Sequence, residues 1–123
     1  MNLRDRHNEL TAYVRDGKFA EGIEEFYAAD VVARENGNEP RNGRDALAAA
    51  EREYLAGVTA YHGLTVHETV VNDQGDGSGT VFYEAEMRWD HKEEGAVHVR
   101  QCVIERWVKG EVADIRFYGT FVP

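Results

Sequence analysis

The spacing of apolar residues along the chain changes its period about halfway. In the first half the period is helical, because Leu3, His7, Leu10 and Val14 recur on one face of a helix. Gly17 follows this stretch and is free to take the left-handed conformation that ends many helices. The pattern therefore predicts an N-terminal helix with one buried face.

Two further helices and one strand are predicted before the midpoint. The shorter helix carries Phe19, Ile23 and Phe26-Tyr27, and the longer one spans 44–55 (RDALAAAEREYL), where strong helix formers dominate. Between them, residues 31–37 (VVARENG) have the pattern of a short strand. The following GNEPRNG is typical of a loop, because glycine and proline interrupt it.

The second half alternates with a period of two, which is typical of strands. Four strands are predicted, at 64–71, 80–89, 97–108 and 111–122, separated by NDQGDGSG, HKEEG and VKGE. The order α-α-β-α-β-β-β-β predicts an α+β fold whose N-terminal helices pack on the concave face of a curved, mainly antiparallel sheet. We expect one domain over residues 1–123, since no repeat divides the chain.

The same alternation assigns the two faces of the sheet and places three polar residues on its inner face. Glu35 shares a face with Val31 and Ala33, and Gln101 and Glu105 share a face with the apolar residues of their strand. A buried carboxylate needs hydrogen-bond partners or a raised pKa, so these positions are candidates for chemistry.

Charge and composition narrow the classes of partner. The 123 residues contain 23 Asp and Glu against 14 Lys and Arg, a net charge of −9, which disfavours nucleic acid. No stretch has the apolar length of a signal peptide or membrane span, and Cys102 has no second cysteine to pair with. We therefore expect a cytoplasmic protein that does not bind membranes.

The segment YAADVVARENG…GRDAL resembles the SnoaL-like proteins of the nuclear transport factor two-like superfamily, which includes ketosteroid isomerase. The resemblance implies a cone-shaped α+β barrel with a deep apolar cavity, assembled as a homodimer through the outer face of the sheet. It places Glu35 where the isomerase has its catalytic acid. The isomerase's second acid falls on Val103, so steroid isomerisation itself is disfavoured.

The resemblance also suggests catalytic roles for three residues. Glu35 would be a general base in an apolar cavity; the alternative is an acid at the end of a strand, held by Asn36, an arginine or loop amides. Tyr13 would donate a hydrogen bond to an oxyanion, or would be packed with its hydroxyl satisfied. Gln101 would orient a ligand, and we expect Glu105 to reach the rim of the cone and pair with a base.

The remaining candidate site residues are those expected to line the cavity and those considered as metal ligands. The cavity residues are predicted to be Phe26, Ala33, Tyr54, Tyr83, Ala85, Met87, Trp89, Val99, Val103, Ile115 and Phe117. Glu51, next to Tyr54 on one helix, contributes to the wall or is solvated. No metal site is predicted, because strict alternation puts His62 and His67 on opposite faces. Cys102 is expected to pack as a small hydrophobe.

These observations support three functional hypotheses. The first is a cofactor-independent isomerase, cyclase or dehydratase of a small hydrophobic carbonyl compound, since all three reactions begin with proton abstraction beside a carbonyl. The second is a non-catalytic binder of a small hydrophobic molecule, and the third is a protein-interaction domain. The outer sheet face mixes apolar and charged residues, which suits the implied homodimer: His98, Arg100, Ile104, Arg116 and Tyr118.

Overall fold

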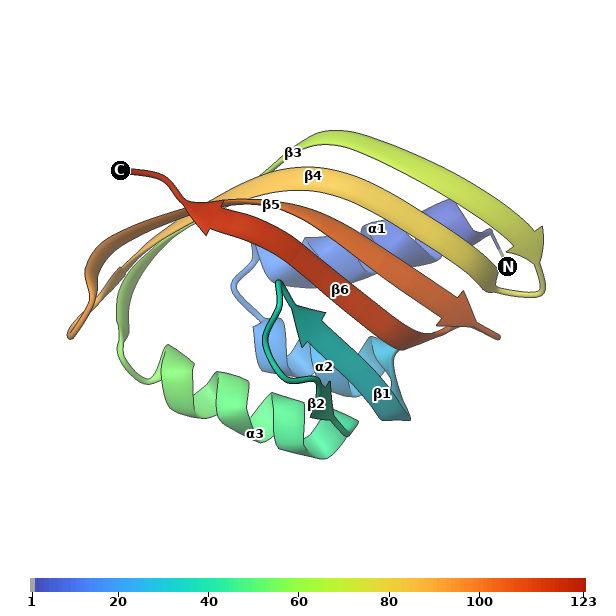
Figure 1. The fold of residues 1–123 in the computed structure, drawn as a ribbon, viewed down its shortest axis with the longest axis horizontal. Coiled ribbons are helices and arrows are strands. Elements are labelled where there is room, and N and C mark those ends of the chain that lie inside the picture. The colour runs from blue at the N-terminus through green and yellow to red at the C-terminus, as the bar shows by residue number, and fades with distance from the viewer. Residues whose placement is uncertain (1) are drawn as a thin grey trace.

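The computed structural model describes residues 2–123 as three helices and one curved sheet (Figure 1). The elements are α1 (Leu3–Arg15), α2 (Phe19–Phe26), β1 (Tyr27–Glu35), β2 (Arg41–Asn42), α3 (Arg44–Leu55), β3 (Val58–Gly75), β4 (Ser78–His91), β5 (Gly95–Val108) and β6 (Glu111–Phe121). The helices lie on the concave side of the long strands, with α1 under β3 and β4 (Figure 1). The predicted cone-shaped α+β fold is confirmed.

The six strands form one open sheet in the order β2-β1-β6-β5-β4-β3. All neighbours are antiparallel except β1 and β6, which are parallel. The two-residue strand β2 was not predicted, because Arg41 and Asn42 lie in the loop-like GNEPRNG and carry no alternation of their own. Their strand conformation comes from pairing with Ala33 and Val32 of β1.

Strand β3 is longer than the predicted 64–71, and bulges interrupt its alternation. Its register against β4 shifts between Tyr61 and Leu64 and again between Val66 and Glu68. Each extra residue changes which face the following side chains point to. The prediction that His62 and His67 lie on opposite faces is therefore wrong: His67 contacts Glu86 on the outer face, and His62 borders the same surface.

The core lies between the helices and the inner face of the sheet, and it includes several residues predicted to line a cavity, Phe26 among them. Phe26 is 1% exposed, packs edge-on against Tyr13 and Trp107, and has the Arg6 guanidinium 4.3 Å from its ring centre. Phe26 is thus a core residue that joins α1, α2 and β5. No helix within residues 2–123 is long and apolar enough to cross a membrane.

Candidate functional site

The inner face of the sheet is organised in rows that run across the strands. In the first row Val81, Glu105, Ile115 and Ala33 are neighbours, and in the second row Tyr83, Val103, Phe117 and Glu35 are neighbours. Beyond them come the third row (Ala85, Gln101, Gly119) and the fourth row (Met87, Val99, Phe121). Exposure rises along this sequence, from none at Val81 to 74% at Phe121. The cone therefore has a packed deep end and an open end.

The deep end holds a buried carboxylate with two donors. Glu105 is fully buried, and its Oε1 lies 2.7 Å from Nδ1 of His7 and accepts a 3.0 Å hydrogen bond from the Trp107 indole. Its Oε2 has no hydrogen-bond partner among residues 2–123. The expectation that Glu105 reaches the rim is wrong, because β5 carries it inward and its base is His7 on the inner face of α1.

Two buried tyrosines, Tyr27 and Tyr83, lie near the pair formed by Glu105 and His7. Burial, reinforced by the charge of Glu105, raises the pKa of Tyr27 and of Tyr83 well above the ordinary value. Both hydroxyls therefore keep their protons and can act only as neutral donors or acceptors. The Tyr83 ring also packs on the His7 imidazole, with 4.9 Å between ring centres.

Glu35 lies on the inner face, as alternation predicts, but at the open end. It ends β1 beside Phe117 in the second row and is exposed. It has no hydrogen bond or ion pair through its side chain with any of residues 2–123. The next residue, Asn36, adopts a positive φ of 51°, and its amide accepts from the Gly119 N–H at 3.0 Å and donates to the Gly119 carbonyl at 3.2 Å. Asn36 thus fixes the end of β1 to β6 rather than holding the Glu35 carboxylate.

A second carboxyl group, on α3, lies within electrostatic reach of Glu35. Glu51 lies on the stripe of α3 that points to the sheet, together with the buried Leu47 and Ala48, and it is itself half-buried. Burial raises the pKa of Glu51, the Arg41 charge opposes this, and the Glu35 charge adds to it. Sequence reasoning left Glu51 as wall or solvated surface, although its spacing from Leu47 and Leu55 already places it on the buried stripe.

The other predicted site residues lie around this opening without forming one cluster. Tyr13 is half-buried on α1 and packs on Phe26, and Gln101 is half-buried in the third row. The Tyr54 hydroxyl donates to Glu94 and accepts a 2.8 Å hydrogen bond from the Trp89 indole. That contact ties the end of α3 to the β4–β5 hairpin.

The predicted lining residues divide by exposure. Tyr83, Ala85, Val103 and Ile115 are buried in the core. Those that remain half-buried are Ala33, Met87, Trp89, Val99 and Phe117, and Tyr54 is exposed. Met87, Trp89 and Val99 lie toward the open end, whereas Ala33 lies in the first row and Phe117 in the second.

Within residues 2–123 the structure bears on two further predictions, one about metal ligands and one about Cys102. No three His, Cys, Asp or Glu side chains in that range converge as metal ligands. Cys102 is exposed on the outer face, so the expectation that it packs as a small hydrophobe is wrong.

Comparison with known proteins places the fold. No family model matches the chain, and no curated protein matches it. Among solved structures, a protein named as a SnoaL-like polyketide cyclase from Mesorhizobium loti is 20% identical with a TM-score of 0.77, covering 96% of this chain and 99% of the other. A protein named as an isomerase from Bacillus subtilis is 17% identical with a TM-score of 0.73, covering 98% and 90%.

A third similar structure is an epoxide hydrolase of the LEH-like type from M. tuberculosis. It is 14% identical with a TM-score of 0.74, and the match covers 96% of this chain and 82% of the other. At these identities the likeness shows the fold alone. The resemblance to SnoaL-like and nuclear transport factor two-like proteins is therefore confirmed as a shared fold.

Proposed function

We propose that this protein is a cofactor-independent acid–base enzyme acting on a small, largely apolar carbonyl compound at the open end of the cone. The observation that carries the proposal is the pair Glu35 on β1 and Glu51 on α3, which lie close enough for the charge of Glu35 to raise the pKa of Glu51. Glu35 is exposed, whereas Glu51 is half-buried and burial raises its pKa. Two carboxyl groups in such different environments are the usual arrangement for a base and an acid.

The two carboxyl groups have complementary roles in the proposed reaction. The Glu35 carboxylate removes a proton from the carbon beside the substrate carbonyl. Glu51, in its protonated form, donates a hydrogen bond to the oxygen as negative charge develops there. Glu51 in this way supplies, from the opposite wall, the carboxylic acid whose expected position in the sheet is occupied by Val103.

The rest of the opening supports binding of an apolar substrate. The apolar floor of the proposed site is half-buried: Phe117 neighbours Glu35, and Met87 and Val99 lie two rows further out. Such a floor holds the substrate by burial of apolar surface and limits water around the reacting carbon. Isomerisation, aldol-type cyclisation and dehydration share the first proton transfer, and names of similar folds include a cyclase and an isomerase.

The experiment follows proton exchange by NMR in D2O at the carbons beside the carbonyl of 2-indanone and cyclohexanone. Glu35→Gln is expected to slow exchange by at least about 100-fold, the usual contribution of a general base, and Glu51→Gln to slow it less. Glu53→Gln is the matched control, because Glu53 is exposed on the same helix. Exchange that Glu35→Gln leaves unchanged, or binding of the ketones by the wild type without exchange, would overturn the proposal.

We further propose that a second copy of the chain covers the part of the outer face of β3–β6 that carries Val70, Phe82 and Ile104, away from the β4–β5 hairpin. Val70, Phe82 and Ile104 are neighbours across three strands there, and Val70 and Phe82 are 56% and 42% exposed. The charges around these three residues nearly balance in a chain of net charge −9, which limits repulsion between two copies there. These charges are Glu68, Glu84 and Asp114 against Arg106 and Arg116.

Sedimentation velocity at micromolar concentration tests this association. The wild type is expected to sediment as a dimer, and Phe82→Asp as a monomer, because the substitution places a charge in the apolar row. A monomeric wild type would contradict the proposal. So would a Phe82→Asp variant that remains dimeric.

A further inference from the structure

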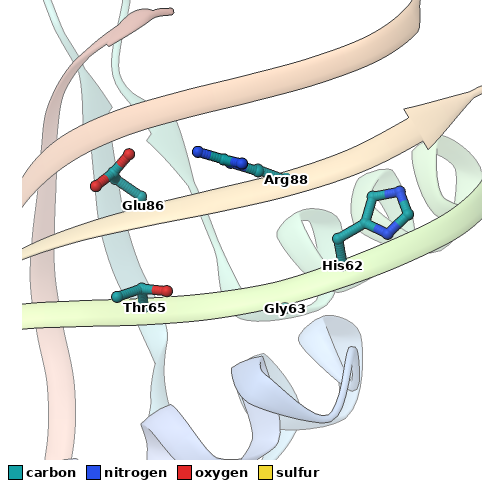
Figure 2. A pocket seen from close by; sticks show the side chains of 5 residues that line it. All are labelled: His62, Gly63, Thr65, Glu86 and Arg88. Carbon is teal, nitrogen blue, oxygen red and sulfur yellow. The ribbon is translucent and has the colours of Figure 1, made fainter.

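The outer face carries a groove at the end of the sheet nearest the β4–β5 hairpin. One hollow of about 390 Å³ is lined by His62, Gly63, Thr65, Glu86 and Arg88 (Figure 2). A second hollow of about 360 Å³ shares His62 and Arg88 with the first. It continues over Trp89, Asp90, Ala96, Val97, His98, Val122 and Pro123. The two hollows form one groove, polar at one end and apolar at the other, with Arg88 at their junction.

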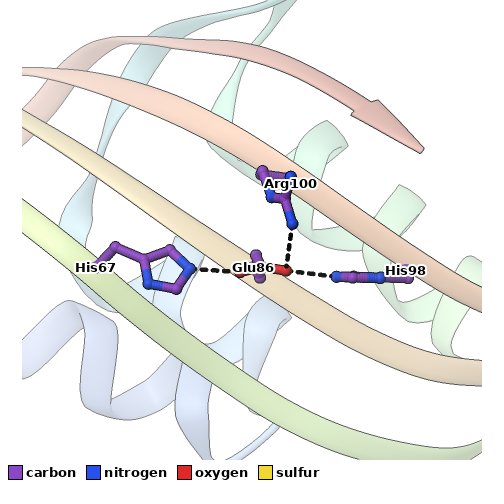
Figure 3. A network of polar contacts seen from close by, with 4 residues as sticks. All are labelled: His67, Glu86, His98 and Arg100. Carbon is purple, nitrogen blue, oxygen red and sulfur yellow. Dashed lines mark hydrogen bonds and ion pairs between the residues drawn. The ribbon is translucent and has the colours of Figure 1, made fainter. Parts of the chain in front are cut away.

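The negative charge at the polar end is already satisfied by neighbouring donors. Glu86 contacts His67 on one side and His98 at 2.6 Å on the other, and Arg100 donates to it at 3.4 Å (Figure 3). The His67 and His98 contacts lower the pKa of Glu86 to about 2. Glu86 is therefore a carboxylate with its partners in place, and its charge does not need Arg88.

The other carboxylate of the groove is also paired. Asp90 Oδ2 lies 3.0 Å from Nε2 of His62. Arg88, by contrast, is exposed and has no hydrogen bond or ion pair with any of residues 2–123. Its neighbour on β5 is His98, which is already engaged with Glu86. The junction of the two hollows thus presents a guanidinium group whose donors are all free.

We propose that this groove binds a small molecule with a carboxylate head and a short apolar tail. The planar Arg88 guanidinium matches a carboxylate with two parallel hydrogen bonds. The tail then lies in the second hollow against Ala96, Val122 and Pro123. The site is on the face of the sheet opposite the cone, and it does not depend on the carbonyl chemistry proposed there.

Titration with hexanoate, followed by ¹H–¹⁵N NMR of the full chain, tests the site. Hexanoate is expected to shift the amide signals of Arg88, Ala96 and Val97, while hexanamide, which has the same shape without the charge, binds at least about tenfold more weakly. Arg88→Gln is expected to weaken hexanoate binding by a similar factor. Arg106→Gln is the matched control, because Arg106 is exposed on the same face outside both hollows.

Two results would overturn this assignment. One is equal affinity for hexanoate and hexanamide, or no binding of either up to tens of millimolar. The other is an Arg88→Gln variant that binds hexanoate as tightly as Arg106→Gln does. Both variants change exposed side chains, so loss of folding does not confuse the comparison.

Discussion

The inner sheet face carries carboxyl groups at its deep end and at its open end, and only the one at the deep end has hydrogen-bond donors within the described part of the chain. At the deep end Glu105 is fully buried, and His7 and Trp107 supply donors to one of its oxygens. Toward the open end Glu35, in the second row, lies within electrostatic reach of Glu51 on α3, and neither side chain has a hydrogen bond or ion pair with any of residues 2–123. Glu105 is in the first row, so Glu105 and Glu35 stand in adjacent rows, two strands apart.

The difference shows that the surroundings of a carboxyl group decide whether it stabilises the fold or is free to exchange a proton with a ligand. A carboxylate held by fixed donors in a packed core stabilises one arrangement of helix and sheet and is inaccessible to a substrate. A partly desolvated carboxyl group without fixed donors has a displaced pKa and is free to exchange a proton with a ligand. On this basis the deep pair positions α1 on the sheet, and the open pair is where chemistry is proposed.

The largest expected effect is the loss of the buried pair. His7→Ala leaves the Glu105 carboxylate buried without its imidazole, and it should lower the free energy of unfolding by about 3–5 kcal/mol. His62→Ala removes an exposed imidazole paired with Asp90 and should cost less than about 1 kcal/mol. Urea unfolding monitored by fluorescence gives both values. Equal losses of unfolding free energy in the two variants would mean that the contact between His7 and Glu105 does not hold α1 on the sheet.

Glycine substitutions compare the packing of the two ends without changing charge. Gly79 has φ +145°, and a Cβ there would lie 2.1 Å from the Asn72 carbonyl oxygen and 2.8 Å from Leu3. Gly79→Ala should therefore cost about 1–3 kcal/mol in strain. Gly37, just after Glu35, has nothing within 4 Å of its Cβ position. Gly37→Ala should change stability by less than about 0.5 kcal/mol in thermal unfolding, and a similar loss in both variants would refute the contrast.

A third prediction concerns the outer carboxylate Glu86, whose donors resemble those of Glu105 but lie in solvent. Its pKa is lowered from 4.5 to about 2, so its contribution to stability is complete above pH 4.5 and is lost as the pH falls toward 2. The melting temperature of the wild type should therefore fall more steeply across this window than that of Glu86→Gln. Parallel curves would show that His67 and His98 do not stabilise the carboxylate.

The smallest expected effect is at Glu51. Burial raises its pKa above 4.5, so Glu51 destabilises the folded state progressively as the pH rises from 4.5 to the raised value, and the full loss remains at higher pH. Glu51→Gln should therefore raise the urea midpoint at pH 7 and leave it nearly unchanged at pH 4. Glu53→Gln should have no such pH-dependent effect. A lower midpoint for Glu51→Gln at pH 7 would indicate that Arg41 already compensates the charge.

The elements that local pattern determines were predicted well. The helix at 44–55 agrees with α3, because strong helix formers fill the whole segment. Alternation also gave the correct face for Glu35 and Gln101, since the pairing of β1 is regular over 32–35 and that of β5 over 99–106. β2 and the bulges of β3 could not be predicted, because they arise from pairing with β1 and β4 rather than from their own residues.

The site was predicted only where one element determines it. Glu105 and His7 lie 98 residues apart, and their contact depends on how α1 docks on β5. The alternation placed Glu105 inside but could not say which end of the cone it occupies. The position of Glu51 could have been predicted, because its helical spacing from Leu47 and Leu55 places it on the buried face of α3.

The central claim is that Glu35 and Glu51 form one coupled pair across the open end. ¹³C NMR titration of the side-chain carboxyl groups tests it without a substrate. The account predicts that Glu51 titrates above 4.5, and that Glu35→Gln lowers its pKa because a neighbouring negative charge is removed. A Glu51 that titrates at or below 4.5 and does not respond to Glu35→Gln would contradict it.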